Sequence, residues 1–400
     1  MPPKSAPFGR AAASRELHRI ATWWMKHTPD TVNGGFVGRV GHDGRRVKYA
    51  DKGVVLNCRI LWFFSEIARA DGRPGYRETA SRAFAYLLEH FDDRQAGGVV
   101  WKLSADGRVS DGKKQVYAQA FCIYALAAYY RLTGEQLALD KALEYFELLE
   151  THARDRRHDG YLDAFSREWQ PLDDMRLDGA DLKAPKSMNS HLHLLEAYSA
   201  LHRVEPTART EAALRHAVEI LCDQVFDAER GHLSLFFDLQ WRRLSEQVSF
   251  GHDIEASWLL WEAVEVLADP QCQQRARPVV ERLAERCLHE GFGALGQLCE
   301  SADPVRGTRS DTGVWWIQAE ALVGFLNACE LTGDPAYGSA ADRIWRYIEA
   351  HLLDTAAGEW RWQFPVAGQP HYLAGFWKGP YHNGRAMLEA CRRCAALGRD

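Results

Sequence analysis

The sequence predicts an all-α protein, an (α/α)6 barrel of twelve helices, six inner and six outer, with short Gly-aromatic hairpins. Two observations carry this prediction. A glycine-centred break recurs six times at intervals of 60 to 71 residues, and each repeat holds two segments with helical apolar spacing. The breaks are NGGF at Gly34, AGGVVW at Gly97, DGYLDAF at Gly160, RGHLSLFF at Gly231, EGFGALG at Gly291 and AGEWRWQF at Gly358.

The helical segments come in pairs, one on each side of a break. The first member of a pair is amphipathic, as in RELHRIATWWMKH, and we expect it in the outer ring. The second is apolar nearly all round, as in YAQAFCIYALAAYY, which is typical of a helix covered on both sides. In order, the predicted helices span residues 11–27, 54–70, 77–90, 116–132, 137–152, 188–202, 211–226, 253–267, 277–287, 315–331, 337–351 and 381–397.

The arrangement of the repeats is a choice between a closed barrel and an open solenoid, since short repeats often build solenoids. We interpret six long helical hairpins as a closed ring. No Pro/Ser-rich linker divides the chain, so we expect one domain over residues 1–400.

The amino-acid composition and charge argue against several classes of protein. The chain has 400 residues, 46% of them hydrophobic, and a net charge of -5 without a basic stripe, so we expect neither disorder nor a nucleic-acid partner. No apolar run is long enough for a membrane span, and the first residues have no apolar core, so we expect neither a membrane span nor a signal peptide. Nine scattered cysteines suit a reducing cytoplasm, and we expect a monomer or weak dimer. Fourteen tryptophans hint at carbohydrate, because indole rings stack on sugars.

Polar residues in the apolar helices cluster at one place, the first turn after each hairpin. In a ring of parallel inner helices these turns converge, so we expect one polar funnel at the positive ends of the helix dipoles. Three histidines from different repeats belong to it: His193, His252 and His382. His191 lies about 200° from His193 on the same helix, so only one of these two can face the funnel, and the spacing does not say which.

Imidazoles suit acid–base chemistry on a carbon next to a carbonyl. One histidine can remove the proton, a second can return it to the other face, and a third, or Arg59, can hold the oxyanion. No phosphate-binding glycine loop occurs, so we expect no nucleotide cofactor. We expect no metal either, although His252 and Glu255, three residues apart, could form half of a metal site.

Several segments together resemble the cellobiose 2-epimerases, part of the N-acylglucosamine 2-epimerase superfamily of (α/α)6 barrels. The resemblance covers nearly the whole chain in the same order. It rests on KGVVLNCRILWFFS at 52–65, KSMNSHLHLLEAY at 186–198, GHDIEASWLL at 251–260, WWIQAEALVGFLNA at 315–328 and GFWKGPYHNGRAMLE at 375–389, and is extended by NGGFVGRV at 33–40 and KQVYAQAFCIYAL at 114–126.

The resemblance implies a cofactor- and metal-independent inversion at C2 of a reducing-end aldose, through ring opening and a cis-enediolate. It implies that His252 and His382 are the two acid/base residues and that His193, rather than His191, assists ring opening. Arg59 would stabilise the enediolate, and Glu255 and Asp181 would orient histidines or bind hydroxyls. The sugar itself would be held by Tyr117, Asn189, Trp316 and Trp377.

Other functions stay open at this point. Relatives act on disaccharides or on mannose and glucose, and some convert an aldose to a ketose through the same enediolate. A glycoside hydrolase would use two carboxylates among Glu255, Glu320 and Asp181, and a non-catalytic sugar-binding protein would turn over nothing. The loop at 155–185 is a candidate lid, although a plain surface excursion is equally compatible with its composition.

Overall fold

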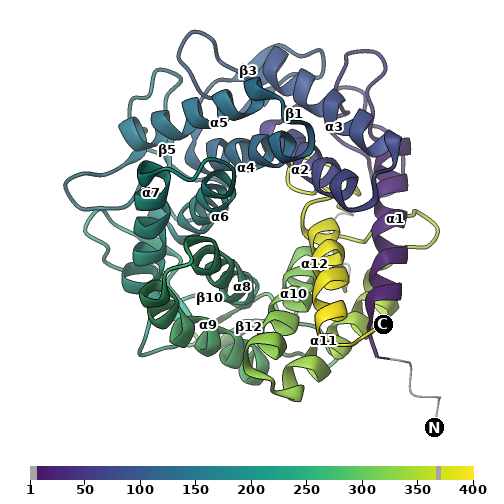
Figure 1. Cartoon of the computed structure of the whole chain (residues 1–400), viewed down its shortest axis with the longest axis vertical. Helices are drawn as coiled ribbons and strands as arrows, with labels where there is room; N and C mark the ends of the chain where they lie inside the picture. Colours follow the sequence, from purple (N-terminus) through teal and green to yellow (C-terminus); the bar gives the residue numbers. More distant parts are fainter. Residues whose placement is uncertain (1–6, 366–370) are drawn as a thin grey trace.

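Two concentric rings of helices form the molecule (Figure 1). The computed structural model describes residues 7–365 and 371–400. The inner ring consists of α2 (Val54–Asp71), α4 (Val116–Thr133), α6 (Met188–Val204), α8 (Phe250–Leu267), α10 (Trp315–Thr332) and α12 (His382–Ala396). The outer ring consists of α1 (Arg10–His27), α3 (Pro74–Tyr86), α5 (Gln136–Leu148), α7 (Ala208–Ile220), α9 (Pro270–Glu290) and α11 (Pro335–Tyr347). The predicted (α/α)6 barrel is confirmed.

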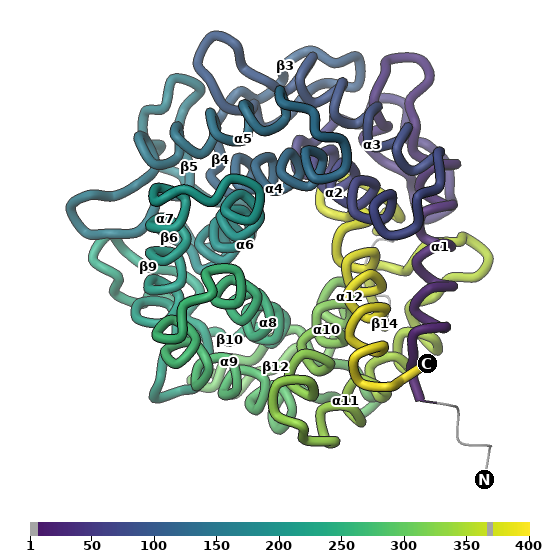
Figure 2. The backbone as a smooth tube through the Cα atoms, in the orientation of Figure 1, coloured from purple at the N-terminus to yellow at the C-terminus, as the bar shows by residue number. Residues whose placement is uncertain are grey.

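The inner ring is closed. Each inner helix packs against the next, from α2 to α12, and α12 packs against α2. Helices from the two ends of the chain also meet, because α1 lies beside α12 (Figure 2). The interpretation as a barrel rather than a solenoid is therefore correct.

Helix boundaries follow the predicted pattern with two differences. Four outer helices widen into a π-helical last turn, at η1 (Leu87–Phe91), η2 (Leu149–Ala153), η3 (Leu221–Val225) and η4 (Ile348–Leu352). The ninth helix was expected to begin at residue 277, but α9 begins at Pro270 and continues through Pro278. Pro278 and Gln274 are both exposed, so water can satisfy the carbonyl that the missing N–H would have met.

Short antiparallel strand pairs connect neighbouring repeats. The strand that opens an inner helix pairs with the strand that follows the next repeat's hairpin. These pairs are β1 (Lys52–Gly53) with β2 (Lys102–Leu103), β4 (Lys114–Gln115) with β5 (Ala164–Phe165), β6 (Lys186–Ser187) with β9 (Phe236–Phe237), β10 (Val248–Ser249) with β11 (Ser301–Asp303), and β13 (Gly313–Val314) with β14 (Gln363–Phe364). A bridge between Val40 and Ala374 connects the last repeat to the first. The remaining strands extend these pairs or form a hairpin: β3 (Val109–Asp111) pairs with β2, β12 (Thr308–Ser310) with β11, and β7 (Phe226–Asp227) with β8 (His232–Leu233).

Five of the six Gly-aromatic hairpins are held by an acidic residue at the start of the hairpin. In the second repeat, Asp93 accepts hydrogen bonds from the backbone of Gln95 and Ala96, and Gly97 then takes a φ of +75°, which favours glycine. Lys114, directly before the inner helix, lies 2.9 Å from Asp93. The same pair recurs as Asp30–Lys52 and Asp155–Lys186. In the sixth repeat Asp354 holds the hairpin, and Lys378 instead pairs with Glu359, directly after Gly358. The fifth hairpin differs: Gly291 ends α9, and Gly296 supplies the positive φ.

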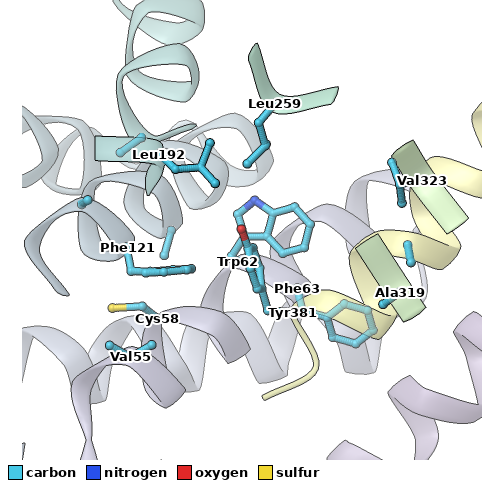
Figure 3. Packing of buried hydrophobic residues seen from close by; sticks show 14 of the residues in the cluster. Val55, Cys58, Trp62, Phe63, Phe121, Leu192, Leu259, Ala319, Val323 and Tyr381 are labelled. Atoms are coloured by element: carbon cyan, nitrogen blue, oxygen red, sulfur yellow. The ribbon is translucent and has the colours of Figure 1, made fainter. Parts of the chain in front are cut away.

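Apolar side chains fill the space between the rings and part of the ring interior. Figure 3 shows Phe121, Leu192, Leu259 and Tyr381 gathered around Trp62. The inner helices are buried almost all round, as their composition predicts. None of the helices in the described residues has the length and apolar character needed to cross a membrane.

Candidate active site

A chamber of about 240 Å³ lies at the N-terminal ends of the inner helices. All ten predicted site residues line it: Arg59, Tyr117, Asp181, Asn189, His193, His252, Glu255, Trp316, Trp377 and His382. The chamber adjoins a larger groove of about 780 Å³, and five residues line both spaces: Leu177, Asp181, Asn189, His252 and Trp316. The convergence of the helix N-termini thus creates the predicted funnel.

Not every polar residue of the first turns faces this chamber. The fourth residue of α4, α6, α8 and α10 turns outward and binds the hairpin of its own repeat. Gln119 bonds both backbone groups of Val99, and His191 accepts from the Tyr161 N–H at 3.0 Å. Asp253 and Gln318 hold Leu233 and Leu298 in the same way. The expectation that the polar residues of the first turns line one funnel is therefore wrong for Gln119, Asp253 and Gln318, and His191 is the histidine of its pair that faces away.

The second and sixth residues of the inner helices face the chamber instead. Tyr117, Asn189 and Trp316 are second residues, and Arg59, His193 and Glu255 are sixth residues. A shift of two residues turns a helix by about 200°, so the second and sixth positions share one face while the fourth lies opposite. This register places His193 in the chamber and His191 outside it.

A buried arginine connects the carboxylates behind the chamber. Arg385 on α12 donates to Glu255 at 2.6 Å, to Glu320 at 2.7 Å and also to Glu196. All four side chains are at most 3% exposed. A buried charge is tolerated when it is paired, and here one guanidinium serves three carboxylates from three different helices.

Each chamber histidine has one ring nitrogen fixed. Nδ1 lies 3.0 Å from Glu196 in His193, 2.6 Å from Glu320 in His382, and 2.7 Å from the Ser249 hydroxyl in His252. The second nitrogen, Nε2, has no hydrogen-bond partner in any of the three rings within the described part of the chain. Two of the three orienting groups are carboxylates held by Arg385.

Burial keeps the histidines neutral. It lowers the pKa of His252 to about 3, and burial with the charges of Arg59 and Arg385 lowers the pKa of His382 well below its ordinary value. Burial also lowers the pKa of His193. Three imidazoles that are uncharged at pH 7 can each accept a proton.

The carboxylates behind the histidines differ in protonation. Burial and the charge of Glu320 raise the pKa of Glu255 well above its ordinary value, and burial also raises the pKa of Glu320. Burial would raise the pKa of Glu196 too, but Arg385 and His193 lower it to about 2. Burial thus favours the protonated form of the Glu255–Glu320 pair, whereas Glu196 carries a full charge.

Arg59 lies on α2, which neighbours α12 in the ring. Its guanidinium donates to the Tyr117 hydroxyl at 2.8 Å and to the Trp377 carbonyl at 2.5 Å, and it lies over the rings of Phe121 and Tyr381. The charge is buried without a carboxylate partner among the described residues. An uncompensated guanidinium in a chamber is suited to an oxyanion.

Aromatic rings form the walls. The ring of Trp316 lies close to two histidines, with centroids 4.9 Å from His252 and 5.5 Å from His382. Trp377 packs against Trp101 and Tyr117. Flat apolar walls with a few convergent polar groups are typical of small-ligand sites.

The predicted lid contributes to both spaces. Leu177 and Asp181, from the segment 155–185, line the chamber and the groove. Burial raises the pKa of Asp181. The far wall of the groove comes from the β11–β12 hairpin through Ser301, Asp303 and Arg306.

A metal site was considered for His252 and Glu255. The acidic and imidazole groups that come together among the described residues are Glu255, Glu320 and His382, whose ligand atoms lie within 4.8 Å of one another, and His252 is outside this group. Arg385 donates to both carboxylates, so a cation already occupies the position between them. The donor set does not fit a metal while this arginine is in place.

Sequence reasoning missed Glu196 and Arg385 and gave Glu320 no role toward a histidine. Glu196 and Arg385 each follow a histidine by about one helical turn: Glu196 is three residues after His193, and Arg385 is three residues after His382. That spacing was a usable signal, because charged residues in apolar helices require partners. The sequence could not indicate that Arg385 meets Glu196, which lies 189 residues away.

Comparisons with known proteins agree with this geometry. A family model described as N-acylglucosamine 2-epimerase matches residues 34–384. The curated cellobiose 2-epimerase of Bacteroides fragilis is 41% identical over 374 residues, covering 93% of this chain and 95% of that protein.

Solved structures give the same picture. The cellobiose 2-epimerase of Bacillus thermoamylovorans has a TM-score of 0.91 and 35% identity, with 96% of this chain and 99% of that chain covered. A D-mannose isomerase has a TM-score of 0.84 at 18% identity, covering 97% of this chain and 100% of that chain, a likeness of fold alone.

Proposed function

The chain belongs to the N-acylglucosamine 2-epimerase family, and from this membership we propose that it inverts C2 of the reducing-end sugar of a cellobiose-type disaccharide. That it is a carbohydrate epimerase follows from its relatives. The substrate, the residues and the chemical steps are the proposal.

One observation carries the mechanism: His252 and His382 both lie beside the Trp316 indole, each with Nδ1 bonded. A sugar resting on Trp316 would lie near both imidazoles. Two bases at different positions around one carbon are what inversion of a stereocentre requires.

The proposed sequence begins with opening of the pyranose ring, assisted by His193. In one direction His252 takes the C2 proton, which leaves a cis-enediolate whose oxygen is stabilised by Arg59. Rotation about C2–C3 presents the other face, and His382 returns a proton to C2 from Nε2. In the reverse direction the two histidines exchange roles.

The proton for this return can come from the carboxyl group behind His382. Glu320 has a raised pKa and lies 2.6 Å from His382 Nδ1, so it can pass a proton to Nδ1 as Nε2 gives one to carbon. The imidazole stays neutral overall, which suits a buried site. Tyr117, Asn189 and Asp181 would bind hydroxyls, and Glu255 would share the proton with Glu320.

The size of the adjoining groove favours a disaccharide over a monosaccharide. The chamber, at about 240 Å³, suits one sugar unit, and the groove of about 780 Å³ offers room for a second. Asp181 and Trp316 line both spaces and would contact the sugar at the glycosidic bond. A mannose 2-epimerase or an aldose–ketose isomerase would use the chamber alone.

Hydrolysis has less support. A glycoside hydrolase needs one carboxyl group as acid and a second as base or nucleophile across the glycosidic bond. Glu255 and Glu320 bond the same guanidinium nitrogen of Arg385, so they lie side by side rather than on opposite sides of a substrate.

The test is incubation of chelator-treated protein with cellobiose, mannobiose, glucose and mannose, followed by chromatography. Glucosyl-mannose from cellobiose is expected. Turnover confined to monosaccharides would replace the proposal with mannose 2-epimerase, or with isomerase if fructose dominates, and unchanged sugars would overturn it.

Isotope exchange tests the proton mechanism separately. In deuterated water, deuterium should enter C2 of the product and of recovered substrate, because the enediolate exchanges its proton with a histidine. Turnover without deuterium uptake would contradict the two-histidine mechanism and indicate a hydride shift.

A further inference from the structure

One buried indole N–H has no partner. Tryptophans whose N–H is itself buried normally bond it, and two fully buried tryptophans here do so: Trp24 donates to Glu359 at 2.6 Å and Trp360 to Glu16 at 2.6 Å. Trp315 is 1% exposed, yet its Nε1 has no hydrogen-bond acceptor in residues 7–365 and 371–400. An unmet buried donor is costly, so it requires an explanation.

The position of Trp315 supplies the explanation. It is the first residue of α10, lines the chamber, and meets the His382 ring edge-on at 5.4 Å. Its backbone N–H donates to the Trp362 carbonyl at 2.9 Å, which fixes the residue at the chamber rim. The indole therefore belongs to the wall beside one of the proposed acid/base residues.

A buried ammonium group strengthens this donor. Lys378 Nζ lies 4.7 Å from the centroid of the Trp315 ring and is itself held by Glu359 and the Leu373 carbonyl. A cation over an indole face is attracted to the π-electrons and draws them toward itself, which makes the N–H more polar. On the α6 side of the chamber, the buried Asn189 Oδ1 also has no partner in the described part of the chain.

We infer that the Trp315 indole N–H donates a hydrogen bond to an oxygen of the reducing-end sugar, on the side of that sugar next to His382. The inference rests on the proposed function for the identity of the ligand. A sugar has many oxygens, so it can supply the hydrogen-bond acceptor that the Trp315 N–H lacks in the described residues. The bond orients the sugar toward the His382 imidazole. Trp315 lines the chamber but not the groove, so it contacts only the reducing-end unit.

Direct observation of the bond is possible by NMR. The protein is labelled with ¹⁵N-indole tryptophan, and the Trp315 signal is assigned by its loss in Trp315→Phe. Saturating cellobiitol, which has no carbonyl and cannot be turned over, should move the Trp315 Hε1 signal downfield and leave the Trp360 signal in place. An unmoved Trp315 signal at a cellobiitol concentration that inhibits turnover would overturn the inference.

An isosteric replacement tests the consequence for catalysis. 3-Benzothienylalanine at position 315 keeps the ring size and removes the N–H, so kcat/KM should fall about 10- to 100-fold, the effect of losing one buried hydrogen bond. Thermal stability should not fall, since no protein partner is lost. The same replacement at Trp360 is the matched control: it removes the bond to Glu16, so stability should fall and kcat/KM should not.

Substrate size separates this inference from the proposed function. Because Trp315 faces only the reducing-end sugar, the replacement should lower kcat/KM by the same factor for glucose and for cellobiose. A loss confined to cellobiose, or kcat/KM within twofold of wild type, would refute it. A Trp315 signal that responds to cellobiitol in a protein without epimerase activity would leave the binding inference standing and remove the proposed function.

Discussion

His191 and His193 are two residues apart on α6 and have different surroundings. His191 is bonded through both ring nitrogens, to the Tyr161 N–H and to the Ser187 carbonyl. Among residues 7–365 and 371–400, His193 is bonded only through Nδ1, to Glu196, and its side chain lines the chamber. One histidine therefore supports the hairpin, and the other is available for chemistry.

Substituting each histidine should separate these roles. His191→Leu leaves the Tyr161 N–H and the Ser187 carbonyl without partners, so the free energy of unfolding should fall by about 1–3 kcal/mol per lost partner, with kcat/KM of the folded fraction retained. His193→Leu should instead lower kcat/KM by about 10²- to 10⁴-fold, as for loss of an acid/base group. Urea unfolding and initial rates measure both quantities, and the reverse pattern would assign the two histidines the other way.

The pH dependence of the reaction should reflect neutral histidines. Because burial lowers the pKa of His252 to about 3, this base stays deprotonated well below pH 6.5. We therefore expect kcat/KM to be retained from pH 7 to pH 5, with the alkaline limb set by loss of the proton on the Glu255–Glu320 pair. An acid limb centred near pH 6.5 would indicate that the histidines titrate as exposed ones do.

The hairpins are the elements on which the register of the inner helices depends. Gly160 has a φ of +73°, and a Cβ there would lie 2.3 Å from the Trp241 ring and 2.9 Å from His191 Nε2. Gly134 caps α4 with a φ of +71°, but a Cβ at that position would have open space around it. Substitution of Gly134 by alanine therefore adds backbone strain alone, whereas substitution of Gly160 adds backbone strain and a steric clash.

Replacing these glycines should give unequal losses of stability. Gly134→Ala should cost about 1–2 kcal/mol, the penalty of a left-handed backbone for alanine. Gly160→Ala adds a clash with Trp241 and His191, so its loss should be larger by about 1–3 kcal/mol. Chemical denaturation of both variants checks this, and equal losses would show that the hairpin relaxes around the extra methyl group.

At this scale the sequence predicts the elements better than their contacts. All twelve helices, the six breaks and the inner and outer roles follow from apolar periodicity, which depends on neighbours three or four residues away. The predicted start of α9 was wrong: the helix was expected from residue 277, but it begins at Pro270 and continues through the exposed Pro278. The outward-facing Gln119 was assigned to the funnel because composition does not distinguish the fourth helical residue from the sixth.

For the site, all ten residues predicted from the sequence line one chamber, whereas Glu196 and Arg385 were not predicted. Their contacts join helices far apart in the sequence, so no local pattern reports them. The chemical roles of all these residues stay predictions until variants are assayed.

The whole molecule should lose stability in acid. Although burial opposes ionisation, hydrogen bonds and Lys52 lower the pKa of Asp30 to about 2, and Arg385 and His193 lower that of Glu196 to about 2. The unfolded chain then binds more protons than the folded one between about pH 4.5 and pH 2, so stability falls as the pH drops through this window. Each carboxylate should account for about 2–3 kcal/mol.

Urea unfolding at a series of pH values from 6 to 3 measures this loss. Asp30→Asn should be less stable at pH 6 and should show a shallower pH dependence. Stability that is unchanged down to pH 3 would contradict the ion-pair account.

A closed ring should also unfold as one unit. Adjacent repeats share strand pairs, and α1 packs on α12, so opening one repeat exposes both neighbours. We expect a single calorimetric transition with equal calorimetric and van't Hoff enthalpies, as the prediction of one domain over residues 1–400 requires. Two resolved transitions would indicate separate domains. A cytoplasmic location and a monomer or weak dimer remain predictions.

Because α1 lies beside α12, the order of the repeats along the chain can be rearranged by circular permutation. The Arg10 N–H donates to the Arg399 carbonyl at 2.9 Å, so a short peptide could join the two regions. A chain reopened at the exposed turn around Gly72, between α2 and α3, would then read the repeats in rotated order. Each repeat contacts its neighbours through short antiparallel pairing, so such a circular permutant should form the same ring. The barrel therefore has no first repeat in the structural sense.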